Sequence, residues 1–180
     1  MTESPQVSLA EVIAGRLRDI PDFPTPGVVF KDVTPLLADP AAFGAVVDDM
    51  ARRRGGHVDL VAGIEARGFI FGAALAHELG IGFVPVRKAG KLPGRVVGAS
   101  YDLEYGTATI EIHEDSFVGG ERVLVVDDVL ATGGTAQAAC GLLEQAHAEV
   151  VAFEAPIELA FLHGRQRLAG RDVHTTLVVH

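Results

Sequence analysis

Residues 122–135 constrain the fold more than any other part of the chain. An apolar run without polar alternation occupies residues 123–126, which is typical of a strand buried on both faces of a parallel sheet. Asp127 and Asp128 follow it directly, and a Thr/Gly loop then leads into an Ala-rich stretch over 136–148. This order predicts a strand, a ligand-facing turn and a helix, with both aspartates at the carboxyl end of the strand, where open α/β sheets bind ligands.

The loop after the two aspartates favours a phosphate as part of the ligand. Gly133 and Gly134 let backbone N–H groups approach an anion without an intervening Cβ, and the positive end of the following helix dipole points to the same place. Asp127 and Asp128 would repel a bare phosphate, so the ligand should also carry hydroxyl groups, a metal ion or both. A phosphorylated sugar meets these conditions.

Length and charge narrow the class of protein further. The 180 residues, 48% of them hydrophobic, predict one α/β domain over 1–180. A formal charge of −9 argues against a nucleic-acid or membrane-surface partner, because such binding needs a broad basic face. The single cysteine, Cys140, agrees with a reducing compartment, and we interpret it as a buried hydrophobic residue. With no signal-peptide pattern and no apolar run near roughly 20 residues, we expect a cytoplasmic protein.

Periodicity and turn signals predict alternating helices and strands. We expect helices over 8–20, 41–54, 69–79 and 136–148, and strands over 59–64, 80–86, 107–112, 123–126, 149–157 and 175–179. This pattern indicates a mostly parallel central sheet flanked by helices. Ser8 is a candidate N-cap, Asp39 precedes the second helix, and the arginines at 52–54 are interpreted as a solvated helix end.

Four more segments are candidates for ligand contact. Arg67 lies in the turn that follows the strand over 59–64, and residues 87–95 concentrate four positive charges in a Gly/Pro-containing loop that suits a polyphosphate. The chain's two tyrosines flank Glu104, in a hairpin that would form a lid over a site. The proline-rich segment 21–27 is either a structural arm or a rigid loop that presents Phe30 to a flat ligand.

Two other phosphate-binding classes are excluded. A nucleoside-triphosphatase loop needs a lysine after its glycines, and no lysine follows Gly134. A phosphoacceptor domain with paired aspartates needs a downstream lysine, which the rest of the chain also lacks.

Residues 123–135 resemble the donor-binding motif of the type I phosphoribosyltransferases, and the resemblance extends nearly end to end. The supporting motifs, in the family's order, are residues 23–30, 65–69, 87–94 and 101–106. Within the family, the chain is similar to the members that use adenine. The resemblance implies a type I phosphoribosyltransferase fold, with residues of about 1–35 as an arm and hood for the base and about 87–112 as a flexible lid. The implied reaction converts adenine and 5-phosphoribosyl pyrophosphate to AMP and pyrophosphate.

The resemblance also implies a role for each matching position. The ribose hydroxyls would contact Asp127 and Asp128, and the 5′-phosphate would contact Ala131, Thr132, Gly133, Gly134 and Thr135. The leaving pyrophosphate would be neutralised by Arg67, Arg87, Lys88 and Lys91, and adenine would be framed by Val29, Phe30 and Arg67. Glu104 would act as general acid or base, with Tyr105 helping to close the lid.

Further family properties follow from the same resemblance. Mg²⁺ would be held mainly by the substrate, the Arg87 position is often supplied across a homodimer interface, and the Glu65–Ala66 peptide would be cis. Glu65 stands where an aspartate is common, and Lys31 replaces a frequent arginine. A transferase for another nucleobase and a non-catalytic, metabolite-sensing regulator remain alternatives, although such a regulator usually carries an added basic nucleic-acid module.

Overall fold

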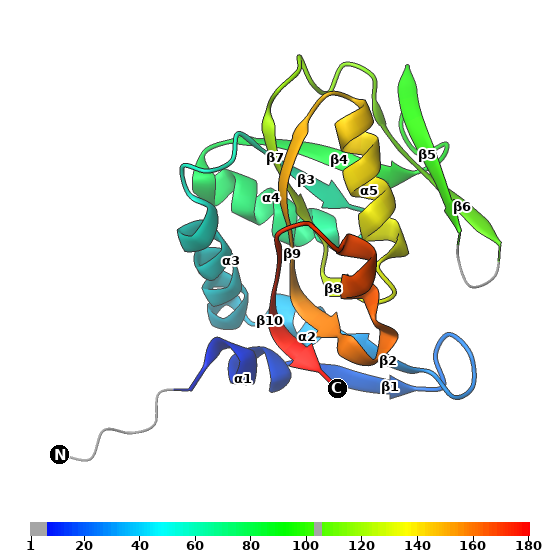
Figure 1. Cartoon of the computed structure of the whole chain (residues 1–180). Coiled ribbons are helices and arrows are strands. Elements are labelled where there is room, and N and C mark those ends of the chain that lie inside the picture. The colour runs from blue at the N-terminus through cyan, green and yellow to red at the C-terminus, as the bar shows by residue number, and fades with distance from the viewer. Residues whose placement is uncertain (1–6, 103–105) are drawn as a thin grey trace.

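The structure is a computed structural model that describes residues 7–102 and 106–180, and it has an α/β fold (Figure 1). The helices are α1 (Leu9–Ala14), α2 (Thr34–Ala38), α3 (Pro40–Arg54), α4 (Gly68–Leu79) and α5 (Gly134–Gln145), with 3-10 turns η1 (Ala160–Leu162) and η2 (Gly164–Leu168). The strands are β1 (Arg18–Pro21), β2 (Val29–Asp32), β3 (Leu60–Ile64), β4 (Gly82–Lys88), β5 (Val96–Asp102), β6 (Thr107–His113), β7 (Arg122–Val126), β8 (Val129–Leu130), β9 (Glu149–Leu159) and β10 (Val173–Val179).

The central sheet has the strand order β10-β9-β7-β3-β4-β6-β5, and β8 pairs with β9. The strands from β10 to β4 run parallel, whereas β6 and β5 extend the sheet as an antiparallel pair. The mostly parallel sheet flanked by helices is therefore confirmed. Because β3 and β7 are parallel neighbours, the turns after them meet at one edge of the sheet.

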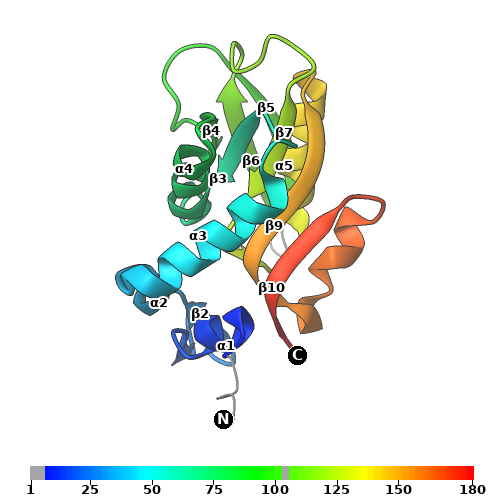
Figure 2. The same cartoon turned by 90° about the vertical axis from the view of Figure 1, so that its left-hand side faces the viewer.

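Residues 123–126 of strand β7 are all apolar, and helices cover both faces of the sheet around them (Figure 2). Val123 and Val125 pack with α5, whereas Leu124 and Val126 pack on the opposite face with α3 and α4. Each of these side chains is fully buried, which contributes about 1.5–3 kcal/mol apiece. This double burial fixes the end of β7, where Asp127 and Asp128 begin the turn.

The N-terminal helix is shorter than predicted. Ser8 is its N-cap and forms a capping box with Glu11, as the sequence suggested, but α1 ends at Ala14 before Gly15. The expectation of a helix up to residue 20 is wrong, because Arg18–Pro21 is strand β1, which pairs antiparallel with β2. Arg18 on β1 also forms an ion pair with Asp32 on β2 at 2.6 Å. The hairpin holds β2, which carries the candidate base-binding residues.

Several other boundaries agree with the sequence. Asp39 caps α3 by accepting hydrogen bonds from the N–H groups of Ala41 and Ala42, and α3 ends before Gly55. Cys140 is buried in α5, and burial raises the pKa of its thiol to about 11. Strand β4 extends through Lys88, so part of the predicted cationic loop is strand. Within the described residues, no helix is long and apolar enough to span a membrane.

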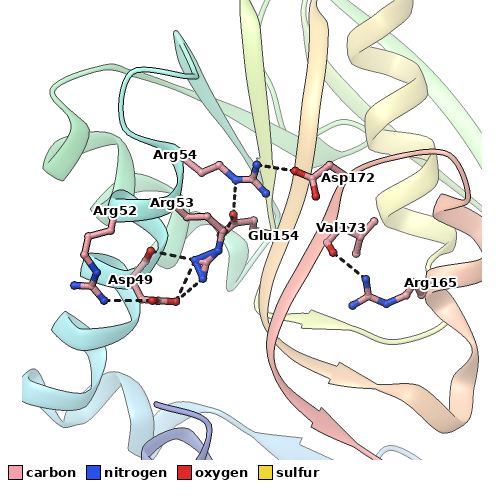
Figure 3. Close-up of polar contacts among 8 residues, drawn as sticks. All are labelled: Asp49, Arg52, Arg53, Arg54, Glu154, Arg165, Asp172 and Val173. Carbon is pink, nitrogen blue, oxygen red and sulfur yellow. Dashed lines mark hydrogen bonds and ion pairs between the residues drawn. The ribbon is translucent and has the colours of Figure 1, made fainter. Parts of the chain in front are cut away.

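The arginine cluster that ends α3 is not a uniformly solvated helix end (Figure 3). Arg52 is 69% exposed, but only 12% of the Arg54 side chain is exposed. Arg54 forms ion pairs with the fully buried Glu154 on β9 and with Asp172 at 2.7 Å. Burial raises the pKa of Glu154 although Arg54 opposes the shift. The prediction that residues 52–54 form a solvated helix end is therefore wrong for Arg54, because α3 ends next to the buried carboxylate of Glu154 on β9.

Candidate active site

A cavity of about 550 Å³ opens at the carboxyl ends of the parallel strands. Its walls come from β2, the turn after β3, the end of β4, the β5–β6 pair and the turn after β7. It brings together many of the residues proposed from sequence: Val29, Phe30, Arg67, Lys88, Asp127, Asp128, Ala131 and Thr135. One cavity thus joins the candidate base-binding and donor-binding groups.

The two aspartates form a carboxylate pair in which Asp128 is buried and Asp127 is partly exposed. Asp127 Oδ1 accepts a hydrogen bond from the Asp128 N–H at 2.8 Å, and 6% of the Asp128 side chain is exposed. Arg67 Nε lies 2.7 Å from Asp128 Oδ2, but without hydrogen-bond geometry, so Oδ2 has no hydrogen-bond partner among the described residues. Burial raises the pKa of both carboxyls, and the neighbouring charge of Asp128 raises that of Asp127 further. Such a pair can accept hydrogen bonds from ligand hydroxyls.

The loop before α5 forms a second, smaller cavity of about 70 Å³. Its lining includes Asp127, Ala131, Thr132, Gly133 and Thr135, whereas Gly134 begins α5 and lines neither of these two cavities. No side chain of the residues that the structure describes caps α5, so the first-turn N–H groups remain available to an anion at the positive end of the helix dipole. The arrangement suits a phosphate group.

Gly133 allows this loop to pack closely on η2. Its φ is +79°, and a Cβ there would lie 2.3 Å from the carbonyl oxygen of Gly164. A Cβ on Gly164 would in turn lie 2.0 Å from the Ala131 carbonyl oxygen. Both positions therefore require glycine for this loop conformation.

Phe30 provides a flat aromatic surface on β2. The Arg67 guanidinium carbon lies 5.0 Å from the Phe30 ring centroid, which is a cation–π distance. Phe23 contacts the same ring edge-on, with centroids 5.3 Å apart. Val29 precedes Phe30 and is 48% exposed. The segment thus offers an aromatic face and backbone groups at the cavity wall.

The candidate pyrophosphate-binding cations are only partly brought together. Lys88 lines the large cavity, but Arg87 and Lys91 do not. Arg87 instead lies 3.4 Å from Glu65 in an ion pair and donates a hydrogen bond to the Lys91 carbonyl oxygen. Burial opposes ionisation of Glu65, but the Lys88 N–H and Arg87 lower its pKa overall. The Glu65–Ala66 peptide is cis, as predicted.

Sequence reasoning missed several contributors to the site. Tyr101 lines the large cavity and accepts a hydrogen bond from Thr135, although the sequence suggested only that the tyrosines belong to a hairpin. Gly164 supports the loop from an irregular segment with no recognisable motif. Glu104 and Tyr105 lie outside the described residues. Within the part of the chain that is described, no group of three or more His, Cys, Asp or Glu residues could hold a metal ion.

Comparison with protein families identifies the class to which this fold and site belong. The model of the phosphoribosyl transferase domain matches residues 37–177, which include the turns after β3 and β7 that line the cavity. The chain therefore belongs to the phosphoribosyltransferase family and is a transferase.

Individual relatives define its place in the family. An adenine phosphoribosyltransferase of Acidothermus cellulolyticus is 58% identical over 176 residues, covering 97% of this chain and 99% of the relative. The crystal structure of the adenine phosphoribosyltransferase of Thermoanaerobacter pseudethanolicus has a TM-score of 0.91 and 47% identity, covering 94% and 99%. That of Saccharomyces cerevisiae, complexed with an imino-altritol bisphosphate and adenine, has a TM-score of 0.89 and 40% identity, covering 94% and 98%. Within its family, the chain belongs to the adenine phosphoribosyltransferases.

Proposed function

We propose that this enzyme transfers the phosphoribosyl group of 5-phosphoribosyl pyrophosphate to adenine, yielding AMP and pyrophosphate for purine salvage. The observation that carries the proposal is the Asp127–Asp128 pair beside the start of α5, in one cavity with Phe30. The yeast relative was crystallised with a sugar-like bisphosphate and adenine, which is the ligand pair that such a cavity would take.

The donor's ribose and 5′-phosphate occupy the part of the site after β7. Asp127 and Asp128 accept hydrogen bonds from the ribose hydroxyls, and this role is supported by Asp128 Oδ2, which has no hydrogen-bond partner among the described residues. The backbone N–H groups of residues 131–135, with the hydroxyls of Thr132 and Thr135, bind the 5′-phosphate. Gly134 contributes by starting α5.

The leaving pyrophosphate is neutralised by Arg67, Lys88, Arg87 and Lys91. Arg67 and Lys88 lie at the cavity, and Glu65 holds Arg87 next to it. Carboxylate oxygens suit Mg²⁺, so the Asp127–Asp128 pair is compatible with a cation bound mainly by the pyrophosphate and ribose oxygens. When bound, Mg²⁺ withdraws electron density from the leaving group.

Adenine binds at β2 and the residues over it. Phe30 and Arg67 provide a stacking surface, and the backbone of Val29 offers hydrogen bonds to the ring edge. Glu104 exchanges a proton with the purine ring, and Tyr105 closes over the site, as the family motif at 101–106 implies. Residues of about 87–112 serve as the lid and about 1–35 as the hood.

Catalysis follows from the charges around the sugar. As pyrophosphate departs, C1′ of ribose gains oxocarbenium character, and the cations at the leaving group stabilise the developing negative charge. Holding adenine and the sugar in one cavity replaces a bimolecular encounter by an oriented reaction. Exclusion of water by the lid prevents hydrolysis of the donor. The enzyme works as a cytoplasmic homodimer, with the Arg87 side chain close to the partner.

A product assay with separate bases tests this function. The chain is incubated with Mg²⁺, 5-phosphoribosyl pyrophosphate and adenine, guanine, hypoxanthine or orotate. AMP formation with adenine alone is the expected result. Product formation only with another base would overturn the substrate assignment, and donor binding without any product would favour a regulatory protein. A Glu104→Gln change is expected to lower turnover, and unchanged turnover would limit that residue to positioning.

A further inference from the structure

A contact between two hydroxyl groups joins residues 131–135, here called the phosphate loop, to the β5–β6 pair. The Thr135 hydroxyl donates a hydrogen bond to Tyr101 Oη at 3.1 Å, in a partly buried position. Among the hydrogen bonds of the described residues, it is the one that links β5 or β6 to the segment from Asp127 through α5. The pairing of Tyr101 with Ala108 on β6 fixes its backbone in the sheet.

Tyr101 lines two cavities. It lines the active-site cavity of about 550 Å³ together with Thr135, and it also lines a neighbouring cavity of about 330 Å³ bounded by α5. The ring packs against the buried cluster that contains α5. These contacts hold the hydroxyl next to the first turn of α5, where the proposed 5′-phosphate site lies.

The hydrogen-bond chemistry of this pair depends on what occupies the loop. A threonine hydroxyl has one proton, whereas an ionised phosphate oxygen only accepts. When phosphate binds, Thr135 must turn its proton from Tyr101 towards the ligand. The tyrosine O–H can then rotate and donate to Thr135 Oγ1, so both hydroxyls stay satisfied and the donor strength of Thr135 increases. A phenylalanine ring would fill the same space but could not do this.

We propose that Tyr101 is a positioning residue that orients the Thr135 hydroxyl towards the 5′-phosphate of the sugar ligand. This role rests on the proposed function, because it requires Thr135 to contact that phosphate. Tyr101 acts through Thr135 and does not itself contact the reacting atoms. Its hydroxyl accepts a hydrogen bond in the free enzyme and donates one in the complex.

The test compares matched hydroxyl deletions by calorimetric titration with AMP and with ribose 5-phosphate. Tyr101→Phe is expected to weaken both ligands roughly three- to tenfold, the effect of one lost hydrogen bond, and to leave the KM for adenine unchanged. Ser100→Ala is the control, since Ser100 lies on the same strand and its hydroxyl, within the described part of the chain, bonds only to the Thr109 hydroxyl, at 2.8 Å. It should bind both ligands like the wild type.

A double-mutant cycle separates positioning from general support of the fold. In a Thr135→Val background, Tyr101→Phe should cause little further loss, whereas in Thr135→Ser, which keeps the hydroxyl, the full effect should return. If Tyr101→Phe bound both ligands with wild-type affinity and had an unchanged melting temperature, this inference would be overturned but the proposed function would stand. The same holds if Tyr101→Phe had its full effect in the Thr135→Val background. A wild-type chain that binds neither phosphate ligand would overturn the proposed function as well, before any variant is made.

Discussion

Asp127 and Asp128 place two carboxyl groups where burial disfavours their charge. Burial raises the pKa of both groups, and Arg67 offsets only part of this effect. Such a pair destabilises the free protein but provides acceptors for ligand hydroxyls, which is a common trade between stability and activity. The residues that define the donor site should therefore be unfavourable for folding.

Replacement of Asp127 by Asn tests whether the charge of the aspartate pair lowers the stability of the free protein. A raised pKa means that the folded state binds the proton more tightly, so stability falls as pH rises from the ordinary value of 3.8 through the raised pKa. Asn removes this cost, and we expect a melting temperature at pH 7.5 about 2–4 °C higher than wild type. The gain should shrink towards pH 4, and AMP affinity should fall. Thermal unfolding at both pH values, with calorimetric titration, measures these effects.

Asp59→Asn is the control of opposite sign. Hydrogen bonds from Arg122 lower the Asp59 pKa to about 2, so its charge supports folding at neutral pH and is lost only in strong acid. This variant should melt at a lower temperature than wild type at pH 7.5. A lower melting temperature for Asp127→Asn as well would contradict the account of the aspartate pair.

Among the structural elements, η2 packs directly against the phosphate loop at Ala131 and Gly133. Arg165 on η2 donates to Glu158 on β9, with Nε 3.1 Å from Oε1. It also donates to the Val173 carbonyl oxygen at 2.8 Å, as Figure 3 shows. These bonds hold Gly164 against Ala131 and Gly133. The conformation of the loop thus depends on an element some 30 residues downstream in the sequence.

A Gly164→Ala change should disrupt the loop. The new Cβ would lie 2.0 Å from the Ala131 carbonyl oxygen, so the loop or η2 must move. We expect at least a tenfold rise in the donor KM, equivalent to about 1.4 kcal/mol, together with a lower melting temperature. Gly141→Ala on α5 is the control, because open space surrounds its Cβ position. It should retain the donor KM, and equal KM values for all three proteins would count against the packing argument.

The ion pairs at the end of α3 join this helix to β9. Arg54→Ala leaves the buried Glu154 without its closest cation, and removing one partner of a buried pair costs about 3–5 kcal/mol. Arg52→Ala, at a 69% exposed neighbour, should cost at most about 0.5 kcal/mol. Urea unfolding of both variants measures the difference. Similar losses in the two variants would show that the Arg54 pair does not hold α3 to the sheet.

Elements were predictable where a local pattern had one interpretation. The apolar run at 123–126, with two aspartates and a Gly-containing loop directly after it, favoured a doubly buried strand, and Asp39 and Gly55 mark the ends of α3. The helix expected over 8–20 was wrong at its end because Ile20 fits helical spacing, whereas its pairing with Phe30 on β2 determines its conformation. The arginines at 52–54 are alike in sequence, and only the position of Glu154 on a distant strand distinguishes Arg54 from Arg52.

Over the whole molecule, the site combines loops that follow separate strands. Residues with a motif of their own, such as Asp127, Asp128 and Arg67, could be assigned from sequence, and the large cavity contains all three. Tyr101 and Gly164 could not, since their contacts with Thr135 and Ala131 exist only after the chain folds. The sequence therefore predicted that Asp127, Asp128 and Arg67 lie at one cavity, but it did not predict which residues support the loop beside them.

A crystal structure of the protein with AMP tests the central claim most directly, because one ligand spans the proposed phosphate, ribose and base sites. We expect the phosphate within hydrogen-bond distance of the backbone at residues 131–135, the ribose hydroxyls on Asp127 and Asp128, and the adenine ring against Phe30. An AMP molecule bound with its phosphate elsewhere, or with its base away from β2, would contradict a single two-substrate site in this cavity.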